Sequence, residues 1–238
     1  MEVKRLVPRL IIDKFAKRTK FMTHLIENRR DFLKRSAVAA IAFPFLMGCK
    51  VETLARETDI LNLIKKNANT SPAVNWCGAI DAPADVSWKT TLTKKSDRDE
   101  PMVISGTVFQ SDGKTPAPNI LIYFYHTDSE GYYGRGNGEI RHGHFRGWML
   151  TDAKGRYQFE SIKPASYPNR TNAAHVHMTI TSIDRKEDSI DSILFEGDRF
   201  ITDRERIPQK GGFNPIVKLE KGADGISRGV RDIQLPQV

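Results

Sequence analysis

Short apolar segments separated by turn-forming residues follow one another from Met102 almost to the end of the chain. Glycine, proline, aspartate and asparagine stand between the segments, and these residues favour turns. The apolar segments span 103–110, 119–126, 148–151, 157–162, 175–183, 193–195 and 230–235. Many short strands at this spacing predict an all-β fold, an antiparallel β-sandwich with long functional loops.

One strand and one loop differ from the rest of this pattern. The segment 119–126 is apolar on both faces, as a strand in the centre of a sheet would be. The segment that follows, 127–146, is long and rich in glycine, arginine and histidine. Because loops of that kind more often carry function than packing, we expect this loop to contribute to a site.

The first 49 residues are typical of an export signal. Arg29-Arg30 begins a twin-arginine motif, and an apolar run from Ala37 to Met47 follows it. The run is shorter than the roughly 20 residues of a membrane-spanning helix, and the alternative is a buried core helix with a basic flank. Leu46-Met47-Gly48-Cys49 resembles a lipoprotein box, in which Cys49 is lipidated; the alternative is ordinary cleavage nearby. We therefore expect export by the twin-arginine route to the periplasm or to a lipid anchor, with Met22 as an alternative start.

Residues 50–100 are expected to form a tether and lead-in ahead of the sandwich, which we place at 101–238. A short helix fits 57–66, since Ile60, Leu61 and Ile64 would share one side of it. The chain has two cysteines. If Cys49 is lipidated, Cys77 has no partner for a disulfide, and we expect it to be a small buried apolar residue.

The positive charge of the chain is concentrated at its start. The formal net charge is +8, and residues 1–50 hold 12 of the 37 basic and 4 of the 29 acidic residues. The remaining residues therefore carry 25 of each sign. This balance gives no reason to expect a nucleic-acid surface, and it leaves the lipid anchor as the expected membrane contact.

A metal-binding pattern lies in the segment 175–183. His175 and His177 are two residues apart, so on an extended strand both imidazoles lie on one face while Val176 points to the other. Two neutral imidazoles on one face can bind a metal together. Tyr167 lies eight residues upstream in a Tyr-Pro pair, and Tyr132 and Tyr133 follow a glycine further upstream. Phenol ligands favour a hard, highly charged ion, which makes Fe(3+) the natural candidate.

Two alternatives remain open from the residues alone. Tyr132 and Tyr133 point in opposite directions on an extended backbone, so only one of them should reach the metal. His142 and His144 form a second His-x-His pair that could be a rival metal site, although its glycine-flanked loop gives less rigid support than a strand.

The order of several short motifs resembles the intradiol ring-cleavage dioxygenase superfamily, to which protocatechuate and catechol dioxygenases belong. The resemblance covers roughly residues 101–235. The motifs are Gly131-Tyr132-Tyr133, the segments 147–152, 155–159 and 163–168, Ala174-His175-Val176-His177, and Phe195-Glu196-Gly197-Asp198.

The resemblance implies an enzyme with one Fe(3+) per chain and the ligands Tyr133, Tyr167, His175 and His177. Tyr132 would then be a pocket wall or a packing residue. A catechol would bind through both oxygens, and Tyr167, at the position of the tyrosine that leaves the iron, would accept a proton. With O2 the ring would open between its hydroxylated carbons to give a muconate-type diacid. Members of the family often assemble, which leaves a homo-oligomer open.

Two positions depart from the family pattern. Asn172 stands where family members have an arginine, and Ser192 stands where they have a glutamine. Asparagine can donate a hydrogen bond but carries no charge, which weakens electrostatic stabilisation. Arg170 or Arg146 could substitute from nearby. The departures favour, as a second hypothesis, a non-catalytic cell-envelope module that binds iron or an aromatic ligand; a purely structural sandwich is the third.

Overall fold

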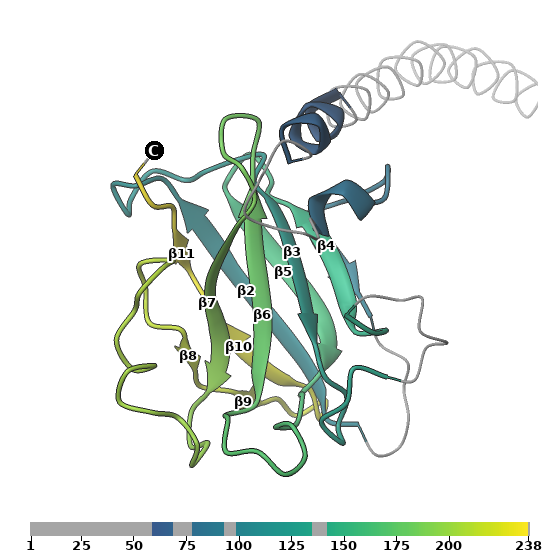
Figure 1. Cartoon of the computed structure of the whole chain (residues 1–238), viewed down its shortest axis with the longest axis vertical. Coiled ribbons are helices and arrows are strands. Elements are labelled where there is room, and N and C mark those ends of the chain that lie inside the picture. Colours follow the sequence, from purple (N-terminus) through teal and green to yellow (C-terminus); the bar gives the residue numbers. More distant parts are fainter. Residues whose placement is uncertain (1–58, 69–77, 93–98, 135–141, 238) are drawn as a thin grey trace, which may run out of the picture. The chain divides into compact units, whose positions relative to one another are not determined.

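The computed structural model describes residues 59–68, 78–92, 99–134 and 142–237 (Figure 1). The expected twin-arginine signal, Cys49 and Cys77 all lie outside these residues. Within the described part of the chain, no helix has the length and apolar character needed to cross a membrane.

Two β-sheets make up the fold. The first has the order β1-β5-β2-β10-β9, and β11 also pairs with β2. Its strands are β1 (Lys89–Thr91), β2 (Pro101–Phe109), β5 (Arg156–Ile162), β9 (Glu220–Lys221), β10 (Ser227–Val230) and β11 (Ile233–Gln234). The second sheet has the order β4-β3-β6-β7-β8. Its strands are β3 (Leu121–His126), β4 (Arg146–Leu150), β6 (His175–Thr181), β7 (Asp188–Phe195) and β8 (Ile216–Val217).

The expected antiparallel sandwich is in fact a mixed one. The central pairs β2–β5, β3–β4, β3–β6 and β6–β7 are antiparallel. Four other pairs are parallel, namely β1–β5, β10–β2, β11–β2 and β7–β8. All four involve short strands that join a sheet from a distant part of the sequence, and strand periodicity carries no information on their direction.

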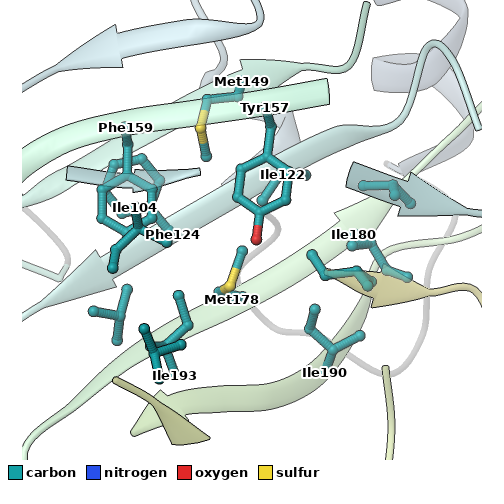
Figure 2. Packing of buried hydrophobic residues seen from close by; sticks show 14 of the residues in the cluster. Ile104, Ile122, Phe124, Met149, Tyr157, Phe159, Met178, Ile180, Ile190 and Ile193 are labelled. Carbon is teal, nitrogen blue, oxygen red and sulfur yellow. The ribbon is translucent and has the colours of Figure 1, made fainter. Parts of the chain in front are cut away.

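The core lies between the two sheets. Every second residue of β3 and β6 points inward, including Ile122, Phe124, Val176 and Met178, which are fully buried. They meet the inner face of β2 and β5, where Phe159 stacks on Phe124 with ring centroids 4.2 Å apart (Figure 2). The opposite face of the second sheet carries Leu121 together with polar and aromatic side chains, including Tyr125 and His177.

Residues that precede the predicted sandwich also pack against it. Residues 59–68 are helical, and Leu61 and Ile64 are buried with Leu121 and Leu150 of the second sheet. The short 3-10 helix η1 (Gly78–Asp81) joins the same cluster through Ala79. The apolar side predicted for the short helix is therefore confirmed, and it serves as a second, smaller core.

The last predicted strand, 230–235, is divided into β10 and β11. Between them, the Asp232 carboxylate accepts a hydrogen bond from the Thr107 backbone N–H at 2.8 Å, and Arg231 N–H donates to the Ser105 carbonyl at 2.9 Å. A side chain thus replaces one backbone partner of β2, which interrupts the ladder without leaving the Thr107 N–H unsatisfied.

A β-bulge lies where β6 meets β7. Val176 pairs with Ile193 and Met178 pairs with Ile190, so His177 faces the two residues Asp191 and Ser192. Such a bulge increases the local twist and changes the direction of side chains. It brings Ser192 beside His177 on the outer face of the second sheet.

Candidate metal centre

Two imidazoles and two phenols converge on the outer face of the second sheet. The Nε2 atoms of His175 and His177 lie 2.9 Å apart. The Tyr167 hydroxyl lies 3.3 Å from the first of these nitrogens and 3.4 Å from the second. The Tyr133 hydroxyl is in direct hydrogen-bond contact with the Tyr167 hydroxyl. Four donor atoms from three segments of the chain therefore surround one point.

Strand β6 holds both histidines as the sequence predicted. His175 and His177 are half-buried on the outer face, while Val176 and Met178 are buried on the inner face. His175 Nδ1 lies 2.7 Å from the Ala173 carbonyl. Because a carbonyl can only accept, Nδ1 carries the proton and the lone pair of Nε2 points into the cluster. On the other ring, Ser192 Oγ lies 3.4 Å from His177 Nδ1.

Asp198 lies in the turn after β7, and its carboxylate fixes the start of β6. Its carboxylate accepts hydrogen bonds from the backbone N–H of Ala174 at 2.8 Å and of Phe200 at 2.9 Å. Gly197, with φ of 86°, supplies the left-handed turn after β7 that brings Asp198 to this position. The Phe-Glu-Gly-Asp motif therefore acts on the segment directly before His175.

The two tyrosine-bearing loops are joined by their backbones. Ala165 N–H donates to the Asp128 carbonyl at 3.0 Å, and the Thr127 hydroxyl donates to the Ala165 carbonyl at 2.7 Å. A Cβ on Gly131 would lie 2.1 Å from the Ser166 carbonyl oxygen. Only glycine allows this approach, and it brings the loop of Tyr133 against the loop of Tyr167.

Burial sets the protonation of the cluster. Burial, with smaller contributions from His175 and His142, lowers the pKa of His177 to about 3, so its imidazole is neutral near pH 7. Burial also raises the pKa of the Tyr133 phenol far above its usual value, and the hydrogen bond between Tyr133 and Tyr167 adds to this. The protein alone thus keeps Tyr133 protonated, and a nearby cation of high charge would be needed to ionise it.

A set of aromatic rings supports the cluster from β3. Tyr125 stacks on His177 with ring centroids 4.6 Å apart and lies 5.9 Å from the Tyr133 ring. His142 stacks on Tyr125 at 3.7 Å, and its Nδ1 lies 2.8 Å from the Tyr123 hydroxyl. The sequence did not predict a role for Tyr123 and Tyr125 at the centre, because they lie in an apolar segment that was interpreted as a packed central strand. Their spacing of two residues was the available signal, since it places both rings on one face.

The second His-x-His pair does not form a metal site of its own. His142 contacts the tyrosines of β3, whereas His144 is exposed and lies against Gly134. Among the described residues, no group of three or more histidines, cysteines, aspartates or glutamates gathers in a metal-binding arrangement.

The residues predicted around the ligands take different positions. Ser192 lies beside His177, as described above. Tyr132 is 55% exposed, so it is not the packing residue that the sequence left as one alternative. Arg146 lies 3.9 Å from Asp81 and 5.4 Å from the Trp148 ring centroid, and it also interacts with Tyr123 of β3. Arg170 is exposed on the turn after Tyr167.

Asn172 carries a buried acceptor. Its Nδ2 donates to the Ala173 carbonyl at 3.3 Å, and within the described structure its buried Oδ1 has no hydrogen-bond partner. The position where the family pattern has a cation therefore offers a neutral acceptor instead.

Known dioxygenases resemble this chain in sequence. The family model described as Dioxygenase matches residues 79–211, more than half of the chain. Catechol 1,2-dioxygenase of Acinetobacter baylyi is 30% identical over 88 residues, covering 36% of this chain and 28% of that protein. Catechol 1,2-dioxygenase 1 of Acinetobacter lwoffii is 27% identical over 144 residues, covering 53% of this chain and 46% of that protein. The chain thus matches less than half of the length of these relatives.

Solved structures share the fold. Catechol 1,2-dioxygenase of Acinetobacter radioresistens superposes with a TM-score of 0.54 at 15% identity, covering 81% of this chain and 70% of that one. The mercury-inhibited enzyme of Acinetobacter sp. ADP1 gives a TM-score of 0.52 at 20% identity, covering 64% of this chain and 58% of that one. The family match and the shared sandwich together place this chain in the intradiol ring-cleavage dioxygenase superfamily.

Proposed function

We propose that this protein is an iron(III)-dependent dioxygenase that cleaves a catechol between its two hydroxylated carbons. The convergence of the Tyr133, Tyr167, His175 and His177 donor atoms carries the proposal. The named relatives are catechol 1,2-dioxygenases, which supports a catechol as the substrate class. Both oxygen atoms of O2 would enter the muconate-type product.

The donor set fits a ferric ion. Atoms that bind a common ion at about 2.0–2.2 Å, at angles near 90–110°, lie about 3.0–3.5 Å apart. The separations of 2.9, 3.3 and 3.4 Å around Tyr167 and the two histidines have this size. The Tyr133 phenol, which burial keeps protonated, needs a strongly charged cation to become a ligand, and this favours Fe(3+) over a divalent ion. When bound, the iron would supply Lewis-acid activation of the catechol and a template that orients it.

The protein side chains would then manage the protons. The Tyr167 hydroxyl contacts Tyr133 and both imidazoles, so it occupies the centre of the cluster. A phenolate at this oxygen can accept one catechol proton. His175 is held by Ala173 with its Nε2 lone pair inward, and the low pKa of His177 keeps that ring neutral. The Nε2 atom of His177 is therefore not available as a proton donor near pH 7.

A non-catalytic iron-binding module is the second candidate, and Asn172 is the observation that favours it. The buried Oδ1 of this side chain is an acceptor, and it replaces a positive charge that would stabilise an activated substrate. In that case the protein would bind iron and a catechol but would not consume O2.

Iron content, colour and turnover distinguish these functions. The iron-loaded protein is expected to hold one Fe(3+) per chain, to show a broad visible band from phenolate on iron, and to consume O2 with a catechol while a muconate-type diacid forms. Tyr167→Phe should retain iron and lose much of the band. Tyr132→Phe is the matched control for colour, since Tyr132 is exposed. Colour and catechol binding without O2 uptake would leave only the binding module, and a colourless iron-loaded protein would refute tyrosinate ligation.

We further propose that the protein is exported by the twin-arginine route and anchored through Cys49. The motifs Arg29-Arg30 and Leu46-Met47-Gly48-Cys49 support this proposal. In cells fed a labelled fatty acid, the full-length chain should become labelled and Cys49→Ser should not. Replacing Arg29 and Arg30 by lysine should leave the protein in the cytoplasm. Equal labelling of both Cys49 forms would exclude this anchor.

A further inference from the structure

His142 connects the long loop between β3 and β4 to the strand behind it. Its Nδ1 lies 2.8 Å from the Tyr123 hydroxyl, and its ring lies almost parallel to that of Tyr125, at 8° and 3.7 Å. Tyr123 and Tyr125 are two residues apart on β3 and share its outer face. One imidazole therefore contacts two successive outward side chains of a rigid central strand.

Burial raises the pKa of Tyr123 to about 12, and it does the same for Tyr125. Tyr123 therefore keeps its hydroxyl proton near pH 7, and one hydrogen bond joins this hydroxyl to Nδ1 of His142.

The backbone at His142 adopts an unusual conformation that holds the imidazole in this contact. His142 has φ of 66°, a left-handed conformation that non-glycine residues seldom adopt, and Gly143 follows with φ of 72°. A Cβ on Gly143 would lie 1.5 Å from the Tyr133 carbonyl oxygen. The corner at 142–143 thus lies directly against the backbone of Tyr133.

Tyr125 forms a second connection between His142 and the centre. Its ring stacks on His142 and on His177, and it lies 5.9 Å from the Tyr133 ring. A movement of His142 would change the packing around a histidine of the centre as well as around Tyr133.

We propose that His142 is a positioning residue for the metal centre: through Tyr123, Tyr125 and Gly143 it fixes the place at which the Tyr133 phenol enters the ligand set. This inference rests on the proposed function, because Tyr133 matters in this way only if the centre binds iron. It assigns His142 no contact with iron or substrate. In the second His-x-His pair, His142 then supports the metal centre, and the pair is not a rival metal site.

Two single variants remove the contact from opposite sides. Tyr123→Phe deletes one hydroxyl and keeps the ring. His142→Asn removes the imidazole, while asparagine still accepts the left-handed backbone. Each variant should weaken iron binding about 10- to 100-fold in competition with a chelator, as loss of an outer partner of a metal ligand commonly does. The visible band of the remaining iron-loaded protein should shift or weaken. The double variant should be little worse than His142→Asn alone, because His142→Asn already removes the hydrogen bond that Tyr123→Phe removes, together with the stacking on Tyr125.

His144→Asn is the control, since it makes the same change on an exposed residue of the same loop. It should keep the wild-type affinity and band. If Tyr123→Phe and His142→Asn melt at lower temperature without iron but keep the wild-type affinity and band, the contact is merely structural and the inference fails. If only His142→Asn loses iron, His142 acts without Tyr123 and the inference also fails. A wild-type protein without iron or colour would instead refute the proposed function.

Discussion

At the scale of single residues, the arrangement of the centre depends on a glycine that lacks a Cβ as well as on the four ligand residues. Gly131 has φ of 87°, and its missing Cβ lets the Ser166 carbonyl approach. The spacing of four residues resembles a family pattern, and it predicted that Tyr133, Tyr167, His175 and His177 bind one metal ion together. Spacing alone could not show the support from Tyr125 and His142, since that support depends on how a loop folds back on a strand.

Gly131→Ala should therefore separate the two tyrosine loops. The substitution adds a left-handed backbone cost of about 1–2 kcal/mol and a clash with the Ser166 carbonyl at 2.1 Å. We expect lower stability in urea and weaker iron binding. Gly197→Ala is a matched control, because Gly197 has nearly the same φ of 86° and has nothing within 4 Å of an added Cβ. Equal losses of stability in both variants would show that the close approach of Gly131 to the Ser166 carbonyl does not contribute to the stability of the protein.

At the scale of elements, strand β6 was predicted from its first residue, since alternation of His and apolar residues marks both of its faces. Strand β7 was predicted only at 193–195 but extends over Asp188–Phe195. Its first half holds Asp188, Ser189 and Asp191 beside one apolar residue, Ile190, and the bulge opposite His177 breaks the period of two. Periodicity therefore misses this strand at the position where it approaches the centre.

Deleting Ser192 tests the bulge as an element. A regular ladder could then form, with Ile190 still opposite Met178 and Ile193 still opposite Val176, so both isoleucines would stay on the inner face. We therefore expect the deletion to lower the melting temperature only modestly but to weaken iron binding, because the extra twist opposite His177 is lost. Ser192→Ala keeps the bulge and removes only a 3.4 Å contact, so it should cost less than about 1 kcal/mol. A deletion variant that binds iron as tightly as Ser192→Ala would mean that the bulge does not shape the centre.

At the scale of the whole molecule, stability should depend on acid because histidines are buried as neutral rings. His126 is fully buried, with Nδ1 2.6 Å from the Thr127 carbonyl and Nε2 2.8 Å from Ser161 Oγ. Burial lowers the pKa of His126 to about 4. The unfolded chain binds this proton near pH 6.5, so the folded state is favoured above that pH and loses the advantage as pH falls from about 6.5 to about 4.

The free energy of unfolding of the iron-free protein should consequently fall by on the order of 3 kcal/mol across that window from His126 alone. Urea unfolding at several pH values measures the slope, and His126→Gln should flatten it even if that variant is less stable throughout. His144→Gln, on an exposed residue, should leave the slope unchanged. A wild-type stability that is level between pH 6.5 and 4 would contradict a neutral buried His126.

The pairing of β2 has a consequence for how the chain reaches its fold. Met102 and Val108 lie in the centre of the first sheet, yet their partners Ser227 and Ile233 come more than a hundred residues later in the sequence. During synthesis β2 can pair with β5 on one side while its other edge waits, and pairings that span such distances form slowly. The nascent protein would then present an open apolar edge to its surroundings for much of translation.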